Sequence, residues 1–276
     1  MTTKTYPRLS AFAEALQSLG QLSFTTAEAM ASVKTTPMGF VKAARRLAKQ
    51  GKLINPRRGF FVIVPPQFYA WGAPPPSWYV DALMAHENRP YYIGLLKAAE
   101  YHGATHQAVM QYQVITDKQL PTKRWGRSVL GFYYRKEMAS IQAGLITRDT
   151  AMGPVVISGP ELTALDMVRY PHACGGFSAV ISALAAFAPK LNQAKLKALL
   201  PAFEKNVSQR LGYLLDLIGQ DESARVILSW LAQQGDLPWI ELIAPSPNPE
   251  LAVLNGVIER NRKWRMIVRD RLELDE

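Results

Sequence analysis

The stretch "AARRLAKQGKLINPRRGFFVIV", Ala43 to Val64, contains six basic residues and no acidic residue before it becomes apolar. The stretch without acidic residues is longer still, because Lys34 to Arg58 holds eight Lys and Arg and no Asp or Glu. Like charges at i,i+4 repel on a helix, and a stable solvated face usually includes Glu among its cations. This composition predicts a surface that meets an anionic partner.

The helical pattern around this stretch predicts its fold. Leu9, Phe12, Leu16 and Leu19 recur at helical spacing before Gly20, which predicts a first helix. In "TTAE", Thr25 as N-cap and Glu28 three residues later form a capping box that opens a second helix. A third helix begins after the cap Thr36 with Pro37 at its first position, and ends near Gln50, before Gly51.

Two strands are expected after the third helix, at Lys52–Ile54 and Phe60–Val64, around the turn "NPRRG". Three helices followed by a hairpin is the element order of a winged helix-turn-helix. If Phe40, Ala44 and Leu47 face the core, the opposite side of the third helix is cationic. The alternative is an ordinary solvated helix face.

In a helix-turn-helix, the second helix of the motif enters the DNA major groove and the wing reaches the backbone or minor groove. We therefore predict a double-stranded DNA interface with three parts. Near the bases it has Thr35, Thr36, Met38 and Lys42; near the phosphates it has Arg45, Arg46 and Lys49; and at the wing tip it has Arg57 and Arg58.

The chain as a whole is basic. Its 276 residues have a formal net charge of +10, which suits nucleic acid, an anionic membrane surface or an acidic protein. Residues 1–66 hold ten Lys and Arg against two Glu, a net of +8, and residues 67–276 hold 22 against 20. Anion binding is therefore expected in the N-terminal part.

The single cysteine, Cys174, excludes an intrachain disulfide framework and a cysteine-rich zinc site, and is typical of a reducing compartment. The N-terminus has no apolar segment of signal-peptide length, and the apolar run Ala179–Ala188 is too short to span a bilayer. We expect a cytoplasmic protein without a membrane partner.

The prolines of "PPQFYAWGAPPPSW", Pro65 to Trp78, interrupt helices and central strands and predict a domain boundary. The expected domains are 1–66 and 77–276, with a possible subdivision near 159. The second domain combines helices with strands at 109–116, 129–135 and 153–159, is mostly helical after residue 160, and ends in a strand at 264–270. The expected fold class is α+β.

Several segments together resemble one family. They are "LSAFAEALQSLGQLSFTTAEAMASVKTTPMGFVKAARRLAKQGKLINPRRGFFVIV", "RPYYIGLLKAAEYHGATHQ", "LTALDMVRYPHACGG", "QRLGYLLDLIG" and "RNRKWRMIV". The sequence resembles the AbiE abortive-infection antitoxins (AbiEi) of bacterial type IV toxin–antitoxin systems, which are linked to phage defence. The resemblance implies repression of the protein's own operon through inverted repeats. It also implies neutralisation of a co-encoded nucleotidyltransferase-like toxin without a stable complex, and no enzymatic activity.

Catalytic and metal candidates are weak. His102 and His106 lie at i,i+4 but have no evident third ligand. Cys174 follows His172 closely, although a lone cysteine is usually a small buried apolar residue. Asp117 next to Lys118 is similar to the carboxylate and lysine of a nuclease site. No second carboxylate lies in a strand at a spacing that would support a two-metal site. No Walker A or G-x-G-x-x-G motif occurs, so we expect no catalytic residue, metal or cofactor.

The terminal segment "ERNRKWRMIVRDR", Glu259 to Arg271, is a second basic cluster. Trp264, Met266 and Val268 alternate like the buried face of a strand, which would point Arg265 and Arg269 to solvent. This predicts either a solvated edge strand or a second surface for DNA, RNA or toxin.

The leading interpretation is an antitoxin and transcriptional autorepressor of a type IV system. One alternative is a transcriptional regulator whose C-terminal domain binds an effector or a partner protein. Another is a nuclease guided by the winged helix, with Asp117 in its site.

Overall fold

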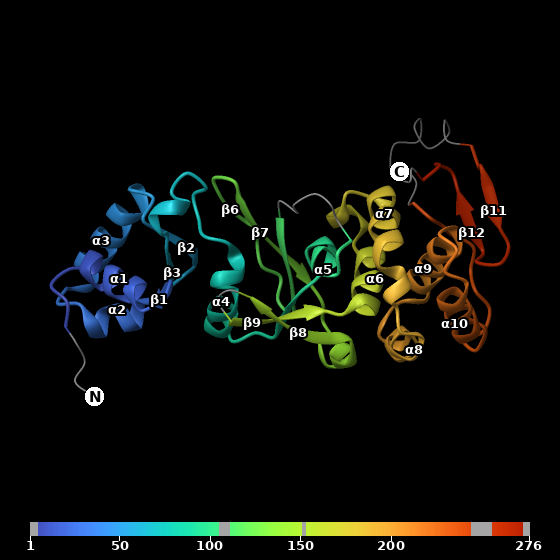
Figure 1. Ribbon diagram of the computed structural model, residues 1–276, viewed down its shortest axis with the longest axis horizontal. Coiled ribbons are helices and arrows are strands. Elements are labelled where there is room, and N and C mark those ends of the chain that lie inside the picture. The colour runs from blue at the N-terminus through green and yellow to red at the C-terminus, as the bar shows by residue number, and fades with distance from the viewer. Residues whose placement is uncertain (1–4, 105–110, 151–152, 244–255, 273–276) are drawn as a thin grey trace. The chain divides into compact units, whose positions relative to one another are not determined.

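The computed structural model describes residues 5–104, 111–150, 153–243 and 256–272, which are coloured along the chain in Figure 1. The chain divides into two compact units. Unit 1 comprises Met1–Tyr91, Met110–Lys136 and Thr147–Val155, and unit 2 comprises Tyr92–Val109, Glu137–Ile146 and Val156–Glu276. The division runs through three strands, β4 (Tyr91–Ile93), β8 (Leu145–Thr150) and β9 (Gly153–Ser158).

The first part of unit 1 has the three predicted helices and the predicted hairpin in that order, with one further strand after the first helix. Its elements are α1 (Leu9–Ser18), β1 (Ser23–Thr25), α2 (Thr26–Ser32), α3 (Pro37–Lys49), β2 (Leu53–Arg57) and β3 (Phe60–Ile63). The strands form an antiparallel sheet in the order β1-β3-β2, with Phe24 opposite Phe61 and Ile54 opposite Val62. Strand β1 was not predicted, because three residues carry no readable periodicity.

The predicted helix caps are confirmed. The Thr25 hydroxyl accepts a hydrogen bond from the Glu28 N–H at 3.2 Å, and the Glu28 carboxylate accepts one from the Thr25 N–H at 2.6 Å. Thr36 caps α3 by accepting from the Gly39 N–H at 3.1 Å. Each cap contributes about 1 kcal/mol and fixes where its helix begins.

Aromatic side chains form the centre of this core. Phe61 stacks on Phe24 and meets Phe40 edge to face, with ring centroids 5.5 Å apart in both pairs. Phe12 packs on Phe24 from α1. Such pairs are worth about 1 kcal/mol beyond their buried area, and they fix which side of α3 faces inward.

The rest of unit 1 follows the proline-rich segment, which forms short 3₁₀ turns at Pro66–Phe68 and Pro76–Trp78. Helix α4 (Val80–Glu87) comes next, followed by strands β5 (Gln111–Thr116), β6 (Lys123–Trp125) and β7 (Ser128–Tyr134). Strand β7 pairs with β5 in parallel and with β6 as an antiparallel hairpin. Unit 1 therefore extends beyond residue 66, and the boundaries 1–66 and 77–276 stay a prediction.

Unit 2 is mostly helical, and the α+β class is confirmed. Strand β4 pairs with β9 in parallel at Ile93 and Ile157. The helices are α5 (Leu95–Tyr101), α6 (Pro160–Arg169), α7 (Phe177–Phe187), α8 (Gln193–Leu199), α9 (Lys205–Leu217) and α10 (Asp221–Ala232). A small sheet has the order β10-β12-β11, from β10 (Ile240–Glu241), β12 (Met266–Val268) and β11 (Glu259–Asn261). Among the described helices, none has the length and apolar character needed to cross a membrane.

Candidate nucleic-acid interface

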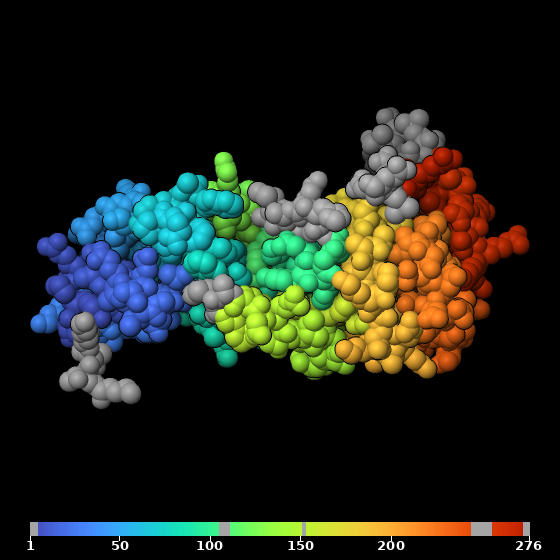
Figure 2. All heavy atoms as spheres, viewed as in Figure 1, coloured from blue at the N-terminus to red at the C-terminus, as the bar shows by residue number. Residues whose placement is uncertain are grey.

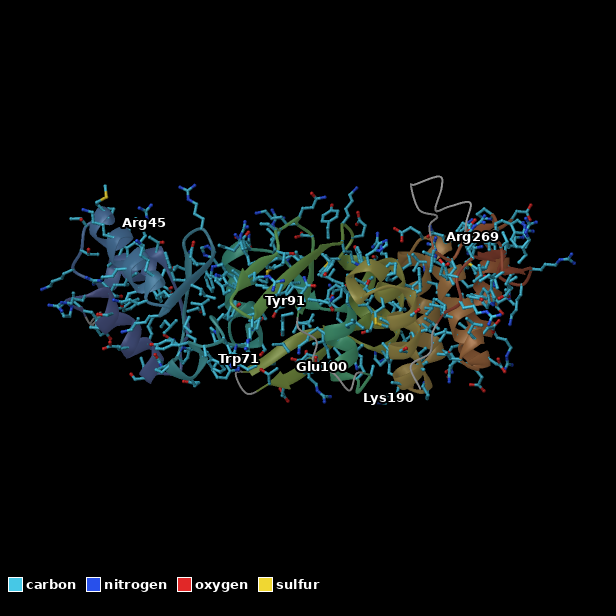
Figure 3. All side chains as sticks on the ribbon, turned by 90° about the horizontal axis from the view of Figure 1, so that it is seen from above. Arg45, Trp71, Tyr91, Glu100, Lys190 and Arg269 are labelled. Atoms are coloured by element: carbon cyan, nitrogen blue, oxygen red, sulfur yellow. The ribbon has the colours of Figure 1, made fainter. Side chains whose placement is uncertain are left out.

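Helix α3 has two opposite faces, as the sequence predicted. Phe40, Ala44 and Leu47 are buried against the core of unit 1. Met38 is 67% exposed on the other side, and Arg45 projects outward from the helix in Figure 3. The buried face anchors the helix, so its outer face is presented on a rigid support.

The outer face of α3 is cationic. Lys42, Arg45, Arg46 and Lys49 are all exposed, and none forms an ion pair with another described residue. An unpaired cation presents its whole positive charge to a partner, whereas an acidic neighbour in an ion pair offsets that charge. This face suits a chain of phosphates.

A hollow of ≈140 Å³ lies beside the start of α3. Arg8, Lys34, Thr35 and Arg46 line it together with apolar residues. The sequence interpretation did not include Arg8 or Lys34 in the interface. Lys34 lies at the edge of the acid-free stretch, a signal that could have identified it, whereas only the fold brings Arg8 beside it.

The hydroxyl of Thr36 is already engaged as the cap of α3. The Thr35 hydroxyl bonds to the Thr36 carbonyl at 3.3 Å, a weak contact that a partner could replace. Of the two threonines, Thr35 therefore has the side chain that is freer to contact a base.

The hairpin of β2 and β3 holds its two arginines differently. Arg57 Nε donates to the Glu87 carboxylate at 2.8 Å, and Lys118 Nζ reaches the same group at 3.2 Å. The Arg58 side chain is exposed without an ion pair to a described residue, while its carbonyl lies 3.1 Å from His86 Nε2. Residues beyond the prolines thus brace the hairpin, which the sequence did not suggest.

Glu87 is the acid that organises this contact. Burial raises the pKa of the carboxyl, but hydrogen bonds from Arg57 and Lys118 outweigh burial and hold the pKa below its ordinary value. Glu87 is therefore ionised at neutral pH, and Arg57 is neutralised by it.

The two units differ more in net charge than residues 1–66 and residues 67–276 do. Unit 1 contains 18 Lys and Arg against 6 Asp and Glu, a net of +12. Unit 2 contains 14 against 16, a net of −2. The excess of positive charge therefore lies in unit 1 as a whole, including its part beyond residue 66.

The catalytic candidates find little support in the described residues. His102 Nε2 lies 2.8 Å from the Ser158 carbonyl, and His106 lies outside the described residues. Burial raises the pKa of Cys174 to about 12, so its thiol is a poor nucleophile at neutral pH. Asp117 pairs with Arg89 at 3.6 Å. Within the described residues, no three His, Cys, Asp or Glu side chains gather as metal ligands would.

The C-terminal basic cluster is neutralised in part. Trp264, Met266 and Val268 are buried, as predicted. Arg269 pairs with Glu241 at 3.1 Å and Lys263 pairs with Asp216 at 2.6 Å. These pairs favour the solvated-strand interpretation for the two cations.

Residues 92–217 match the family described as the AbiEi antitoxin C-terminal domain. This segment of the chain therefore belongs to the family of AbiEi antitoxin C-terminal domains. The match begins with the first residue of unit 2 and covers α5 to α9 of that unit. It also covers β5, β6 and β7 of unit 1, so the antitoxin-like part of the chain includes segments of both units.

A similar fold also occurs in a solved structure. The crystal structure of the RV2827C protein from Mycobacterium tuberculosis is 15% identical, with a TM-score of 0.64 over 97% of this chain and 94% of that one. The solution structure of the antibiotic-resistance factor ANT(2'')-Ia aligns over 56% of this chain and 89% of that one. It is 11% identical with a TM-score of 0.26, which is too low for a shared fold. No curated protein matches the chain significantly.

Proposed function

We propose that this AbiEi-family antitoxin binds duplex DNA in its own promoter through unit 1 and represses its own operon. The uncompensated cationic face of α3 is the observation that carries the proposal. Helices α1 to α3 followed by the β2–β3 hairpin support a winged helix-turn-helix.

The residues divide the work by position. Thr35, Met38 and Lys42, at or near the start of α3, contact base edges. Thr36 is the N-cap of α3 and fixes where the helix begins. Arg45, Arg46 and Lys49 neutralise phosphates farther along the helix, and Arg58 does so from the hairpin tip. Arg57 acts through its pair with Glu87, which positions the hairpin against α4.

The antitoxin half of the proposal rests on the family match. An antitoxin requires a toxin, and a co-encoded nucleotidyltransferase-like toxin is the expected partner, with no stable complex. Unit 2 has little net charge, so its contribution to DNA binding is small and its role is neutralisation. In this proposal the protein is cytoplasmic and performs no catalytic step.

Gel-shift titration of the full chain on its own promoter tests DNA binding. We expect affinity to fall with salt by a log–log slope of about 0.9 per neutralised phosphate. Arg45→Ala should weaken every duplex alike, whereas Lys42→Ala should alter sequence preference. Lys195→Ala, at an exposed position on α8 of unit 2, is the matched control. A salt-independent or absent shift would reject the proposal.

Co-expression with the neighbouring open reading frame tests the antitoxin role. We expect that gene to encode a nucleotidyltransferase that is lethal unless this chain is present. If the neighbour is harmless and the promoter is still bound, the chain is a regulator with an effector-binding or partner-binding second unit instead.

A further inference from the structure

A second cationic surface lies in unit 1, away from α3. Residues 118–136 contain six Lys and Arg and no Asp or Glu, and they include the β6–β7 hairpin. Of the six, Arg135 is buried and Lys118 pairs with Glu87, so the surface charge is mainly that of the hairpin itself. Lys123, Arg124 and Arg127 lie in this hairpin, and none of them pairs with an acid among the described residues. The nearby acids Glu87 and Asp117 are already paired with other cations, which leaves the hairpin charge uncompensated.

An exposed tryptophan is fixed beside these cations. The Arg127 N–H donates to the Trp71 carbonyl at 3.1 Å, which holds the loop before α4 against the hairpin turn (Figure 1). The contact requires glycine, because a Cβ on Gly126 would lie 2.6 Å from the Trp71 carbonyl oxygen. Gly72 and Gly126 also have positive φ, at 85° and 51°.

The Trp71 side chain is 55% exposed although its backbone is held in place. The adjoining segments of the loop and the hairpin are seen on the surface in Figure 2, next to each other. Trp125 of the same hairpin is half-buried. Aromatic surface next to unpaired cations is the combination that binds an unpaired base together with its phosphates.

We propose that Trp71 and the β6–β7 hairpin form a contact for single-stranded nucleic acid. Trp71 stacks on a base, and Arg124 and Arg127 neutralise the adjoining phosphates. A duplex offers only its phosphates to such a surface, which would leave the indole unused. Arg45 and Trp71 lie at opposite edges of unit 1 in Figure 3, so this contact is distinct from the α3 face.

This surface goes beyond operator binding and does not depend on it. Single-stranded DNA and RNA share the stacking and phosphate chemistry, so both are possible sources of the ligand. Stacking on one indole reads no particular sequence, and the contact is therefore expected to tolerate many sequences.

Fluorescence anisotropy of the full chain with labelled oligo(dT), oligo(U) and promoter duplex tests the proposal. We expect Trp71→Ala, and separately Arg124→Ala with Arg127→Ala, to weaken binding of at least one oligonucleotide about tenfold. Binding of the promoter duplex should change less than twofold. The arm that responds identifies DNA or RNA as the ligand.

Matched controls lie in unit 2. Trp239 is 45% exposed, so Trp239→Ala removes a comparable indole, and Lys195→Ala with Lys197→Ala removes two exposed cations. Both controls should bind the oligonucleotides like the unaltered chain. If Trp71→Ala fails to fold by circular dichroism, Trp71→Phe and the arginine pair carry the test, and the phenylalanine variant should retain most of the binding.

Three results would overturn the proposal. The unaltered chain could fail to bind both oligonucleotides, or Trp71→Ala and Trp239→Ala could bind them equally well. The hairpin variants could also weaken the promoter duplex as much as the single strands, which would make the hairpin part of the operator contact. Loss of promoter binding alone, with oligonucleotide binding intact, would reject the proposed repressor and leave this contact standing.

Discussion

Basic residues do different work in the two units. In unit 2, Arg169, Lys263 and Arg269 each pair with an acid at 3.1 Å or less. In unit 1, the outer face of α3 and the β6–β7 hairpin carry cations without ion pairs to described residues. Unit 1 has 18 Lys and Arg and unit 2 has 14, so the contrast between these sites lies in pairing: the paired cations stabilise the fold, and the unpaired ones are available to a partner. Pairing, more than composition, separates a solvated surface from a binding surface.

The largest expected effect tests whether the units act independently. Trp264 is fully buried in unit 2, and its indole N–H donates to Asp216 at 2.6 Å. Trp264→Ala should destabilise the protein by about 3–5 kcal/mol, because it leaves a cavity beside α9. Urea unfolding measures this loss.

The exposed Trp239 provides the control for this substitution, since Trp239→Ala should cost less than about 0.5 kcal/mol. At a temperature where unit 1 stays folded, Trp264→Ala should still bind the promoter. Equal loss of promoter binding and stability would show that the units do not act independently.

Charge reversal on α3 tests the separation of functions. Lys42→Glu combined with Arg45→Glu should weaken promoter binding at least about a hundredfold, because two unpaired cations are lost and two repulsive charges are gained. A promoter-fusion assay should show loss of repression, while survival against the co-expressed toxin persists. If protection also disappears although the chain stays folded, neutralisation depends on DNA binding and the division between the units is wrong.

The Arg57–Glu87 pair allows a smaller test, of stability against pH. Glu87 has a lowered pKa, so its pair contributes stability above the ordinary value of 4.5, and this contribution is lost as pH falls below 4.5. Glu87→Gln should cost about 1 kcal/mol at neutral pH, since Arg57 and Lys118 lose a charged partner.

Denaturant midpoints of Glu87→Gln and the unaltered chain should therefore differ at neutral pH and converge well below pH 4.5. A difference that persists in acid would mean that the substitution acts through packing and not through charge.

The smallest effect is expected from a paired cation of unit 2. Arg269→Ala removes a partly buried pair with Glu241 and should change stability by at most about 1 kcal/mol. Its promoter affinity and salt slope should match those of the unaltered chain, in contrast with Arg45→Ala. If Arg269→Ala reduced the salt dependence of promoter affinity, the C-terminal cluster would be part of the DNA interface.

Local signals in the sequence were enough to predict α1 to α3 and the faces of α3. A helix cap is a contact between residues at most four positions apart, as the caps formed by Thr25 and Thr36 are. Helical spacing likewise predicts from one turn which positions are buried and which are exposed. The same reasoning predicted the buried alternation of Trp264, Met266 and Val268. The run without acidic residues at 118–136 can also be recognised in the sequence, but the net charge summed over all of residues 67–276 is small and conceals it.

The sequence by itself determined the cationic helix, its caps and the α+β class, because these depend on neighbours along the chain. Only the tertiary structure decided which cations are free. Arg57 meets Glu87 across 30 positions and Arg269 meets Glu241 across 28, and no periodicity encodes such pairs. The hydrogen bond from Arg127 to Trp71 likewise joins distant segments. Folding brings such groups together by packing apolar surface, and the charges that find no acid there are left for a partner.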